Sequence, residues 1–323
     1  MLSYILRRFL QTLVVIVLLS YVVFTLMALM PGDPVELMIS SNPKITPEDI
    51  VRLREFYGLD QPAWKRYGNW ISTIAQGDLG YSRTYRVPVT ELLGPRLWNT
   101  FVLSVASLGF SLLIAIPLGI ASALKPGGRL DSFLNIFSFA GISIPSFWLG
   151  IMLIMIFAVK LGWLPAGGTQ TIGLEEASFA ARFGDSLYYL ILPVLSLSIQ
   201  AIGRFVRFTR SSMMEALRHD FIRTAKAKGL PRSAVLWRHA FRNALIPLVT
   251  VVALSISSVF SGAILTETVF SYQGVGKLVF DSIIANDFNV AMVSFIISIS
   301  MVLIMNLVAD ILYGFVDPRI SYS

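Results

Sequence analysis

Long apolar runs separated by polar segments dominate the pattern of this 323-residue chain. Six runs stand out, at residues 9–30, 100–124, 133–159, 187–208, 245–266 and 290–315. A helix rises about 1.5 Å per residue and a hydrocarbon core is about 30 Å thick, so each run is long enough to cross a membrane once. The pattern predicts an all-α polytopic membrane protein with six transmembrane helices.

The first run would also suit a cleaved signal peptide, because Arg7 and Arg8 precede it. The run is too long for that, however, and no small-residue cleavage site follows before Pro31. We therefore expect an uncleaved first span. Prolines lie in or at the ends of later spans, which indicates kinked helices supported by their neighbours in a bundle. They are Pro117, Pro145, Pro193 and Pro247.

The connecting segments alternate in charge. Ten Lys and Arg lie between Arg204 and Arg242 against two acids, Glu215 and Asp220, and Lys125 and Arg129 mark another basic connection. The segments 31–96, 160–185 and 267–287 are balanced or acidic. Because basic loops stay in the cytoplasm, this alternation predicts both termini on the cytoplasmic side.

We divide the chain into four parts. These are a first transmembrane helix (1–30), an extracytoplasmic loop domain (31–99), a transmembrane domain with helices 2–6 (100–315) and a cytoplasmic tail (316–323). In the loop domain, Thr46 of ITPED is placed to cap an amphipathic helix that runs to about Tyr57 and ends at Gly58. The segment 267–290 is too apolar for a plain loop and predicts an interfacial or re-entrant helix, Gly276 to Ala285.

The composition of the chain limits the kinds of site that it could contain. The chain is 55% hydrophobic and 14% charged, with a net charge of +7 concentrated in one loop, which favours the positive-inside rule over nucleic-acid binding. It has no cysteine, and His219 and His239 lie in the basic loop, so no metal-ligand set is expected. GVGK at 274–277 lacks the spacing and the hydroxyl residue of a phosphate-binding loop. We expect neither a catalytic site nor a cofactor or metal site in this chain.

Few ionisable residues lie within the spans. Asp310, near the end of the last span, is expected to snorkel or to pair with a basic residue, with a gating role as the alternative. Small and hydroxyl residues of the later spans suit either close helix packing or the lining of a wet pathway. The candidates for pathway lining are Ser196, Gln200, Ser257, Ser258, Ser261 and Asn306.

The basic loop, residues 209–244, carries its own helix signals. Ser212 and Glu215 have the spacing of a capping box, and Asp220 is placed to cap a short helix from Phe221 to Lys228. Gly229 would end that helix, and Pro231 suits the start of a third helix at about 232–245. A short capped helix between tight turns is shaped for docking; a basic surface bound to anionic lipid is the alternative.

Short motifs in a fixed order also resemble a known family. They are LRRFL (6–10), MPGDP (30–34), YGLDQP (57–62), GDLG (77–80), FIRTAKAKGLP (221–231), RHAFRNALIP (238–247), ILTETVFS (264–271), GVGK (274–277) and DPRI (317–320). Together they cover nearly the whole chain and resemble the first permease subunit of the dipeptide/oligopeptide/nickel class of ATP-binding-cassette (ABC) importers. The resemblance implies a type I importer permease fold in the cytoplasmic (inner) membrane of a prokaryote.

The resemblance also implies a role for the basic loop. Permeases of this kind carry an E-A-A-x-x-x-G motif on a coupling helix that docks on an ATPase subunit; here Arg223, Thr224 and Ala225 hold the first three positions and Gly229 the last. The usual Glu is absent, so no contact of that carboxylate is carried over. The expected coupling residues are Asp220, Phe221, Ile222, Arg223, Thr224, Ala225, Lys226, Ala227, Lys228 and Gly229.

The implied partners are a second permease, one or two ABC ATPase subunits that hold ATP and Mg, an extracytoplasmic substrate-binding protein and membrane lipids, with no nucleic acid. The chain would form half of a pathway for di- or oligopeptides. Nickel or a nickel chelate, glutathione or an oligosaccharide are the alternative substrates. The absence of an intramembrane His or Cys favours peptides over nickel. A self-sufficient channel or secondary carrier is the remote alternative, disfavoured by the scarcity of intramembrane charge.

Overall fold

The computed structural model of the chain describes residues 2–29, 39, 46–56, 59–174 and 176–316, while the side chains of residues 2–4, 257–262 and 312–316 fall outside the description. The described part is helical, with one isolated bridge between extended segments at Tyr81 and Pro88. The expected all-α fold is confirmed.

The helices vary widely in length. They are α1 (Leu2–Ala28), α3 (Pro47–Phe56), α4 (Ala63–Ala75), α5 (Val89–Leu124), α6 (Arg129–Ser143), α7 (Ser146–Leu153), α8 (Phe179–Arg218), α9 (Asp220–Ala227), α10 (Arg232–Ala234), α11 (Arg242–Val269), α12 (Val275–Ile284) and α13 (Phe288–Val316), with π-helical segments at Ile154–Lys160 and Val235–Phe241. In the described residues, five stretches are long and apolar enough to cross a membrane, and α6 with α7 and its π-helical extension makes a sixth if the pair is one span. The predicted number of six spans agrees with the count in which the bent pair is one span.

The third span, predicted as one run over 133–159, is broken. Helix α6 and the helix that begins at Ser146 meet at 102°. Ile144 between them has an extended backbone (ψ 124°), and Pro145 follows it. A proline disfavours the helical conformation of the residue before it, so the break follows from the Ile-Pro sequence.

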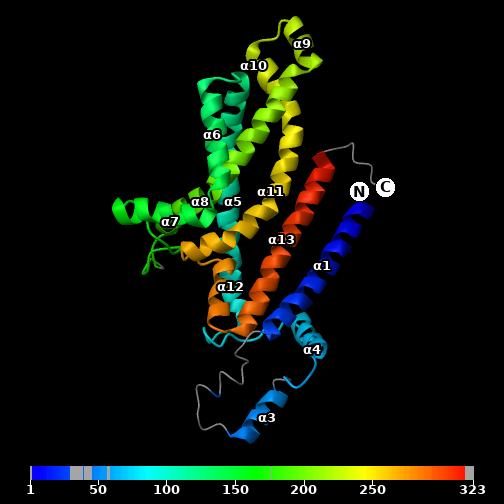
Figure 1. Ribbon diagram of the computed structural model, residues 1–323, viewed down its shortest axis with the longest axis vertical. Coiled ribbons are helices and arrows are strands. Elements are labelled where there is room, and N and C mark those ends of the chain that lie inside the picture. Colours follow the sequence, from blue (N-terminus) through cyan, green and yellow to red (C-terminus); the bar gives the residue numbers. More distant parts are fainter. Residues whose placement is uncertain (1, 30–38, 40–45, 57–58, 175, 317–323) are drawn as a thin grey trace.

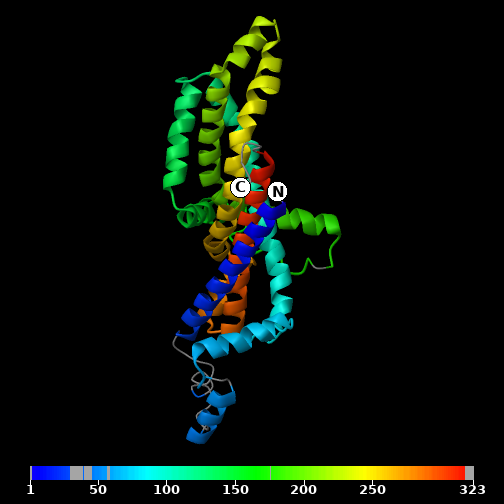
Figure 2. The ribbon, with the colours of Figure 1, turned by 90° about the vertical axis from the view of Figure 1, so that its right-hand side faces the viewer.

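The molecule is long, with a different set of elements at each end. Helix α9 stands at one end, and α3, α4 and α12 lie toward the other (Figure 1). Helix α8 is central and packs against α5, α6, α7 and α11, whereas α1 packs along α13 at the edge of the bundle (Figure 2).

Two clusters show how the bundle is held. Between α5, α6 and α8, the buried side chains of Ala115, Leu134 and Phe205 pack together. Near the end that holds α12, Val89 and Leu93 of α5 pack against α12 and α13. Helix α5 therefore reaches from one end to the other and starts before the predicted span at 100–124.

The small helix predicted in the loop domain is present as α3. Thr46 caps it as expected: its hydroxyl accepts from the Asp49 amide (3.2 Å), and the Asp49 carboxylate accepts from the Thr46 hydroxyl (2.7 Å) and amide (3.1 Å). These hydrogen bonds from Thr46 lower the pKa of Asp49. The predicted end at Gly58 lies outside the described residues.

Candidate functional site

Helix α9 covers the end of the bundle with one face. Ile222 and Ala225 are 1% and 4% exposed and pack in a cluster with Ala123 of α5, Met213 of α8 and Ala240. Residues three apart lie on the same face of a helix, so Ile222 and Ala225 form one face of α9 that packs against the neighbouring helices. The predicted short helix is therefore an integral part of the fold and not a free loop.

The opposite face of α9 is polar and exposed. Arg223, Thr224, Lys226 and Lys228 all point away from the cluster. Arg223 lies 3.5 Å from Asp220, but both side chains are more than 80% exposed, so this pair contributes little to stability. The exposed face of α9 is thus a basic surface, and the buried face holds the helix in place.

Two details of the predicted capping are wrong. Ser212 and Glu215 lie inside the continuous helix α8 and start no helix. Asp220 is the first residue of α9, whereas His219 occupies the cap position without a side-chain hydrogen bond. The long, partly apolar α8 continues through the predicted start because its buried residues extend to Ala216.

The end of α9 is formed as predicted. Gly229 has φ +72°, its amide donates to the Lys226 carbonyl (3.0 Å), and the Leu230 amide donates to the Ala225 carbonyl (3.3 Å). This pair of bonds is the Schellman motif, in which a left-handed glycine ends a helix. Pro231 then caps α10, which continues through a π-helical segment into α11 as one extended helix in place of a separate third helix.

The pathway candidates differ in their surroundings. Ser196 donates to the Ser146 carbonyl (2.8 Å), and Gln200 donates to the Ile144 carbonyl (2.5 Å), so both tie α8 to the break between α6 and α7. Asn306 is exposed on α13. The side chains of Ser257, Ser258 and Ser261 lie outside the described residues. A pathway role for these residues stays a prediction.

Asp310 has the basic partner that its position suggested. Arg8 of α1 lies 3.5 Å from its carboxylate, at side-chain exposures of 44% and 29%. The pair joins the N-terminal part of α1 to the C-terminal part of α13.

A second acidic residue, Asp131, forms a buried cluster that the sequence analysis missed. Its carboxylate accepts from Arg210 Nε (2.5 Å) and a terminal Arg210 nitrogen (2.8 Å), from the Ser122 hydroxyl (2.5 Å) and from the Gly127 amide (2.8 Å). This joins α5, α6 and α8 at the end nearer α9. The only sequence signal was an acidic residue, Asp131, beside the basic connection just before the predicted third span.

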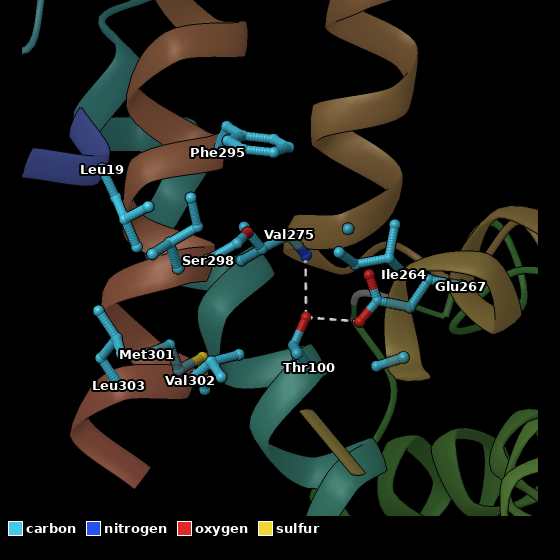
Figure 3. Close-up of a pocket in the computed structure, with 13 residues that line it drawn as sticks. Leu19, Thr100, Ile264, Glu267, Val275, Phe295, Ser298, Met301, Val302 and Leu303 are labelled. Carbon is cyan, nitrogen blue, oxygen red and sulfur yellow. Dashed lines mark hydrogen bonds between the residues drawn. The ribbon is translucent and has the colours of Figure 1, made fainter. Parts of the chain in front are cut away.

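Glu267, in the last turn of α11, is also buried and was also missed. One carboxylate oxygen accepts from the Thr100 hydroxyl of α5 (2.6 Å), which itself accepts from the Val275 amide (2.9 Å); the other accepts from the Lys277 amide (3.1 Å). Glu267 and Thr100 thus cap α12, whose own cap position, Gly274, has no side chain. Figure 3 shows Thr100 between Glu267 and Val275, beside a cavity of about 270 Å³ lined by apolar residues of α1, α11 and α13.

The glycines of the GVG sequence are explained by this carboxylate. A Cβ on Gly274 would lie 2.2 Å from the Glu267 carboxyl carbon, and one on Gly276 would lie 2.5 Å from the Ile264 Cα. Both distances are shorter than any packing contact, so the start of α12 fits only without these side chains. The available signal was a pair of glycines seven and nine residues after Glu267. Burial, and next the Glu267 carboxylate, raise the pKa of neighbouring Tyr272.

The other end of α12 is anchored by a third buried acid. Asp287, 2% exposed, accepts from the Ser82 hydroxyl (2.6 Å) and the Thr84 amide (2.9 Å) of the loop before α5. The predicted helix in the segment 267–290 is therefore present as α12 and is fixed to the body at both ends.

No cluster of three potential metal ligands occurs among the residues that the structure describes. Helix α9, held by one buried face and basic on its exposed face, is the most distinctive candidate site and suits contact with another protein.

Comparison with known proteins places the chain among transport proteins. Residues 115–322 match the model of the family described as binding-protein-dependent transport system inner membrane component, and residues 1–104 match its N-terminal counterpart. The oligopeptide transport system permease protein AppB of Bacillus subtilis (strain 168) is 40% identical over the full length of both chains. The dipeptide transport system permease protein DppB of Escherichia coli (strain K12) is 36% identical, again over both full lengths.

Solved structures agree at the level of fold. Two inward-facing forms of the MetNI methionine ABC transporter match with TM-scores of 0.54 and 0.55 at 18% and 17% identity, and the match covers 70% and 71% of this chain and 96% and 97% of theirs. Both family models and full-length relatives therefore lead to one conclusion: the chain belongs to the family of binding-protein-dependent transport system inner membrane components.

Proposed function

We propose that this chain is a permease subunit of an ATP-driven ABC importer and forms half of the pathway for di- or oligopeptides. The observation that carries the proposal is the full-length identity to permeases named for oligopeptide and dipeptide transport. Nickel or its chelates, glutathione and oligosaccharides are the alternative cargoes that a direct test should include.

Helix α9 is the proposed contact with an ATPase subunit. Its basic face is exposed, while Ile222 and Ala225 hold it against α5 and α8. A helix fixed in this way moves with its neighbours, so a push on α9 is passed directly into the long helices α8 and α11. ATP and Mg belong to the partner ATPases in this scheme.

The motion would reach the membrane through α8. This helix is continuous from Phe179 to Arg218, and Ser196 and Gln200 bond it to the backbone at the α6–α7 break. A tilt of α8 therefore carries the break with it. Closure of two ATPase subunits would thus alternate the access of the pathway between the two sides of the membrane.

The remaining partners follow from this scheme. A second, similar permease would complete the pathway, and an extracytoplasmic binding protein would deliver the substrate to the end formed by α4, α12 and the loop before α5. The α9 end would then lie in the cytoplasm with both termini on that side, as the concentration of Lys and Arg in 204–242 favours.

Affinity purification of the tagged chain from its native membrane in a mild detergent tests the assembly. We expect a second permease and one or two ATPases with a phosphate-binding loop to be recovered. Recovery of the chain alone, with conductance after reconstitution, would instead support a self-sufficient channel.

Uptake into proteoliposomes that hold the recovered complex and its binding protein tests the cargo. We expect ATP-dependent uptake of a labelled di- or tripeptide. ATP-dependent uptake of a nickel chelate, glutathione or an oligosaccharide, without peptide uptake, would keep the importer and overturn the peptide assignment.

A further inference from the structure

Three arginines on one side of α8 line a cavity that the proposed transport cycle does not use. Arg204, Arg207 and Arg210 follow at three-residue spacing and face α6 across a cavity of about 520 Å³. Apolar side chains of Phe139, Ile142 and Phe208 complete its walls. The cavity is therefore basic on one wall and apolar on the other.

The three arginines differ in whether a negatively charged partner compensates their charge. Arg210 is paired with the buried Asp131 at 2.5 Å. Arg207 lies over the Phe139 ring at 4.4 Å, a contact that leaves its charge in place. Arg204 has a buried Nε without a hydrogen-bond partner. Among the described residues, no carboxylate forms an ion pair with Arg204 or Arg207, so the cavity carries two uncompensated positive charges.

The depth of the cavity in the membrane indicates which group compensates these two positive charges. Arg210 is bonded to the first turn of α6, next to the basic connection that holds Lys125 and Arg129. Arg204 lies six residues before Arg210 on α8, which places it about 9 Å nearer the membrane centre. The headgroup layer on each side of a hydrocarbon core is several ångströms thick, so the three arginines span the level of the lipid phosphates.

We propose that this cavity binds the phosphate of an anionic phospholipid from the leaflet on the α9 side. Guanidinium groups bind phosphate oxygens in pairs, and basic pockets between transmembrane helices at this level suit lipid headgroups. The exposed Phe139 (58%) and Phe208 (47%) lie where the acyl chains would continue. A peptide substrate fits less well, because the described lining offers no free carboxylate for its amino terminus.

The site would also affect the mechanism. A phosphate held by Arg204 and Arg207 sits directly beside the Asp131–Arg210 pair that joins α6 and α8. Bound lipid would therefore restrict the movement of α6 relative to α8, the helix that leads into α9. The inference rests on the proposed orientation only for the choice of leaflet, and it is independent of the cargo.

Native mass spectrometry of the purified complex with phosphatidylglycerol, cardiolipin or phosphatidylethanolamine tests the proposal. The Arg204→Gln/Arg207→Gln variant should bind phosphatidylglycerol about 30-fold more weakly, since each basic side chain near an anionic leaflet contributes about fivefold. Arg129→Gln is the matched control, because Arg129 is an exposed cation at the same end of α6 outside the cavity. The control removes one cation at the same level and should weaken lipid binding at most about fivefold.

A second measurement covers the case in which the double variant does not fold. The melting temperature of the unmodified complex should rise with phosphatidylglycerol or cardiolipin and stay constant with phosphatidylethanolamine, inorganic phosphate or a tripeptide. Equal lipid binding by the double variant and the control would overturn the proposal. A rise with tripeptide alone would assign the cavity to substrate, and a rise with inorganic phosphate alone would assign it to a soluble anion.

Discussion

Buried acidic side chains carry much of the specific structure at the scale of single residues. Glu267 and Asp287 fix the two ends of α12, and Asp131 joins α5, α6 and α8. Each accepts several hydrogen bonds, which a buried carboxylate needs. The partly exposed pair of Arg8 and Asp310 lies at a longer distance, 3.5 Å, and has more contact with solvent.

Replacement of Glu267 by Ala should destabilise the complex, because the buried donors of Thr100 and Lys277 lose their acceptor. We expect a loss of about 1–3 kcal/mol, measured by denaturation in detergent. Glu267→Gln keeps an acceptor oxygen and should cost less. Equal losses for the two variants would contradict the account of the hydrogen bonds.

Gly274→Ala should be destabilising by about 1–3 kcal/mol, because the new methyl group collides with the Glu267 carboxylate. The same change should cost much less in a Glu267→Ala background, since the collision is then removed. A double-mutant cycle measures this coupling, which we expect at about 0.5–3 kcal/mol. Strictly additive losses would show that Gly274 is required for another reason.

Asp131→Ala should cost about 3 kcal/mol, because it leaves the mostly buried Arg210 without its charged partner. Asp310→Ala is the matched control and should cost less than about 1 kcal/mol, since the pair with Arg8 is partly exposed and long. Thermal denaturation of both purified variants compares them. A loss for Asp310→Ala as large as that for Asp131→Ala would show that exposure does not separate the two pairs.

At the scale of elements, α9 combines a buried face with an exposed basic face. Its end depends on Gly229, whose φ of +72° is closed to proline and unfavourable for other residues. The position of the helix therefore depends on two features, the Schellman motif at its C-terminal end and the packing of Ile222 and Ala225 on its buried face.

Charge reversal at Lys226 and Lys228 should uncouple ATP hydrolysis from uptake, because it alters the docking face and spares the buried one. In proteoliposomes we expect uptake to fall at least tenfold while the chain stays folded. Arg129→Glu, an exposed cation on α6 outside the α9 face, is the control and should leave uptake unchanged. Normal uptake by the double variant would remove α9 from the proposed contact.

Gly229→Pro should have the same functional result by another route. Proline can neither adopt the positive φ nor donate the bond to the Lys226 carbonyl, so the end of α9 must rearrange. The ratio of ATP hydrolysed to substrate taken up should rise. A normal ratio in a folded complex would show that the position of α9 does not matter for coupling.

At the scale of the whole molecule, the two ends carry different chemistry. The α9 end is basic, whereas the α12 end holds Glu267 and Asp287 together with the loop before α5. The long helices α8 and α11 connect the α9 end to the middle of the bundle, and α5 connects both ends. A membrane between these ends would place α9 and α12 on opposite sides.

This orientation can be tested directly, because the chain has no cysteine. A cysteine at Lys226 should react with a membrane-impermeant maleimide only in inverted vesicles. A cysteine at the exposed Lys65 should react only from the other side, in intact cells or right-side-out vesicles. The reverse labelling pattern would overturn the proposed orientation while leaving the fold intact.

Features that depend on local pattern could be predicted from the order of the residues alone. Apolar runs determined the number of spans, because hydrocarbon accepts only long apolar helices. Thr46 and Asp49 determined the start of α3, and Gly229 determined the end of α9, because capping is an interaction between near neighbours. The ordered motifs indicated the family before any geometry was known.

Contacts between residues far apart in the chain could not be predicted, because they depend on how the helices pack. Ser212 and Glu215 looked like a helix start, but the packing of α8 against its neighbours carries the helix through them. The bond between Thr100 and Glu267 joins residues 167 positions apart, and that between Asp131 and Arg210 joins residues 79 apart. No local pattern encodes such pairs, because the burial that makes them necessary exists only once the helices have come together.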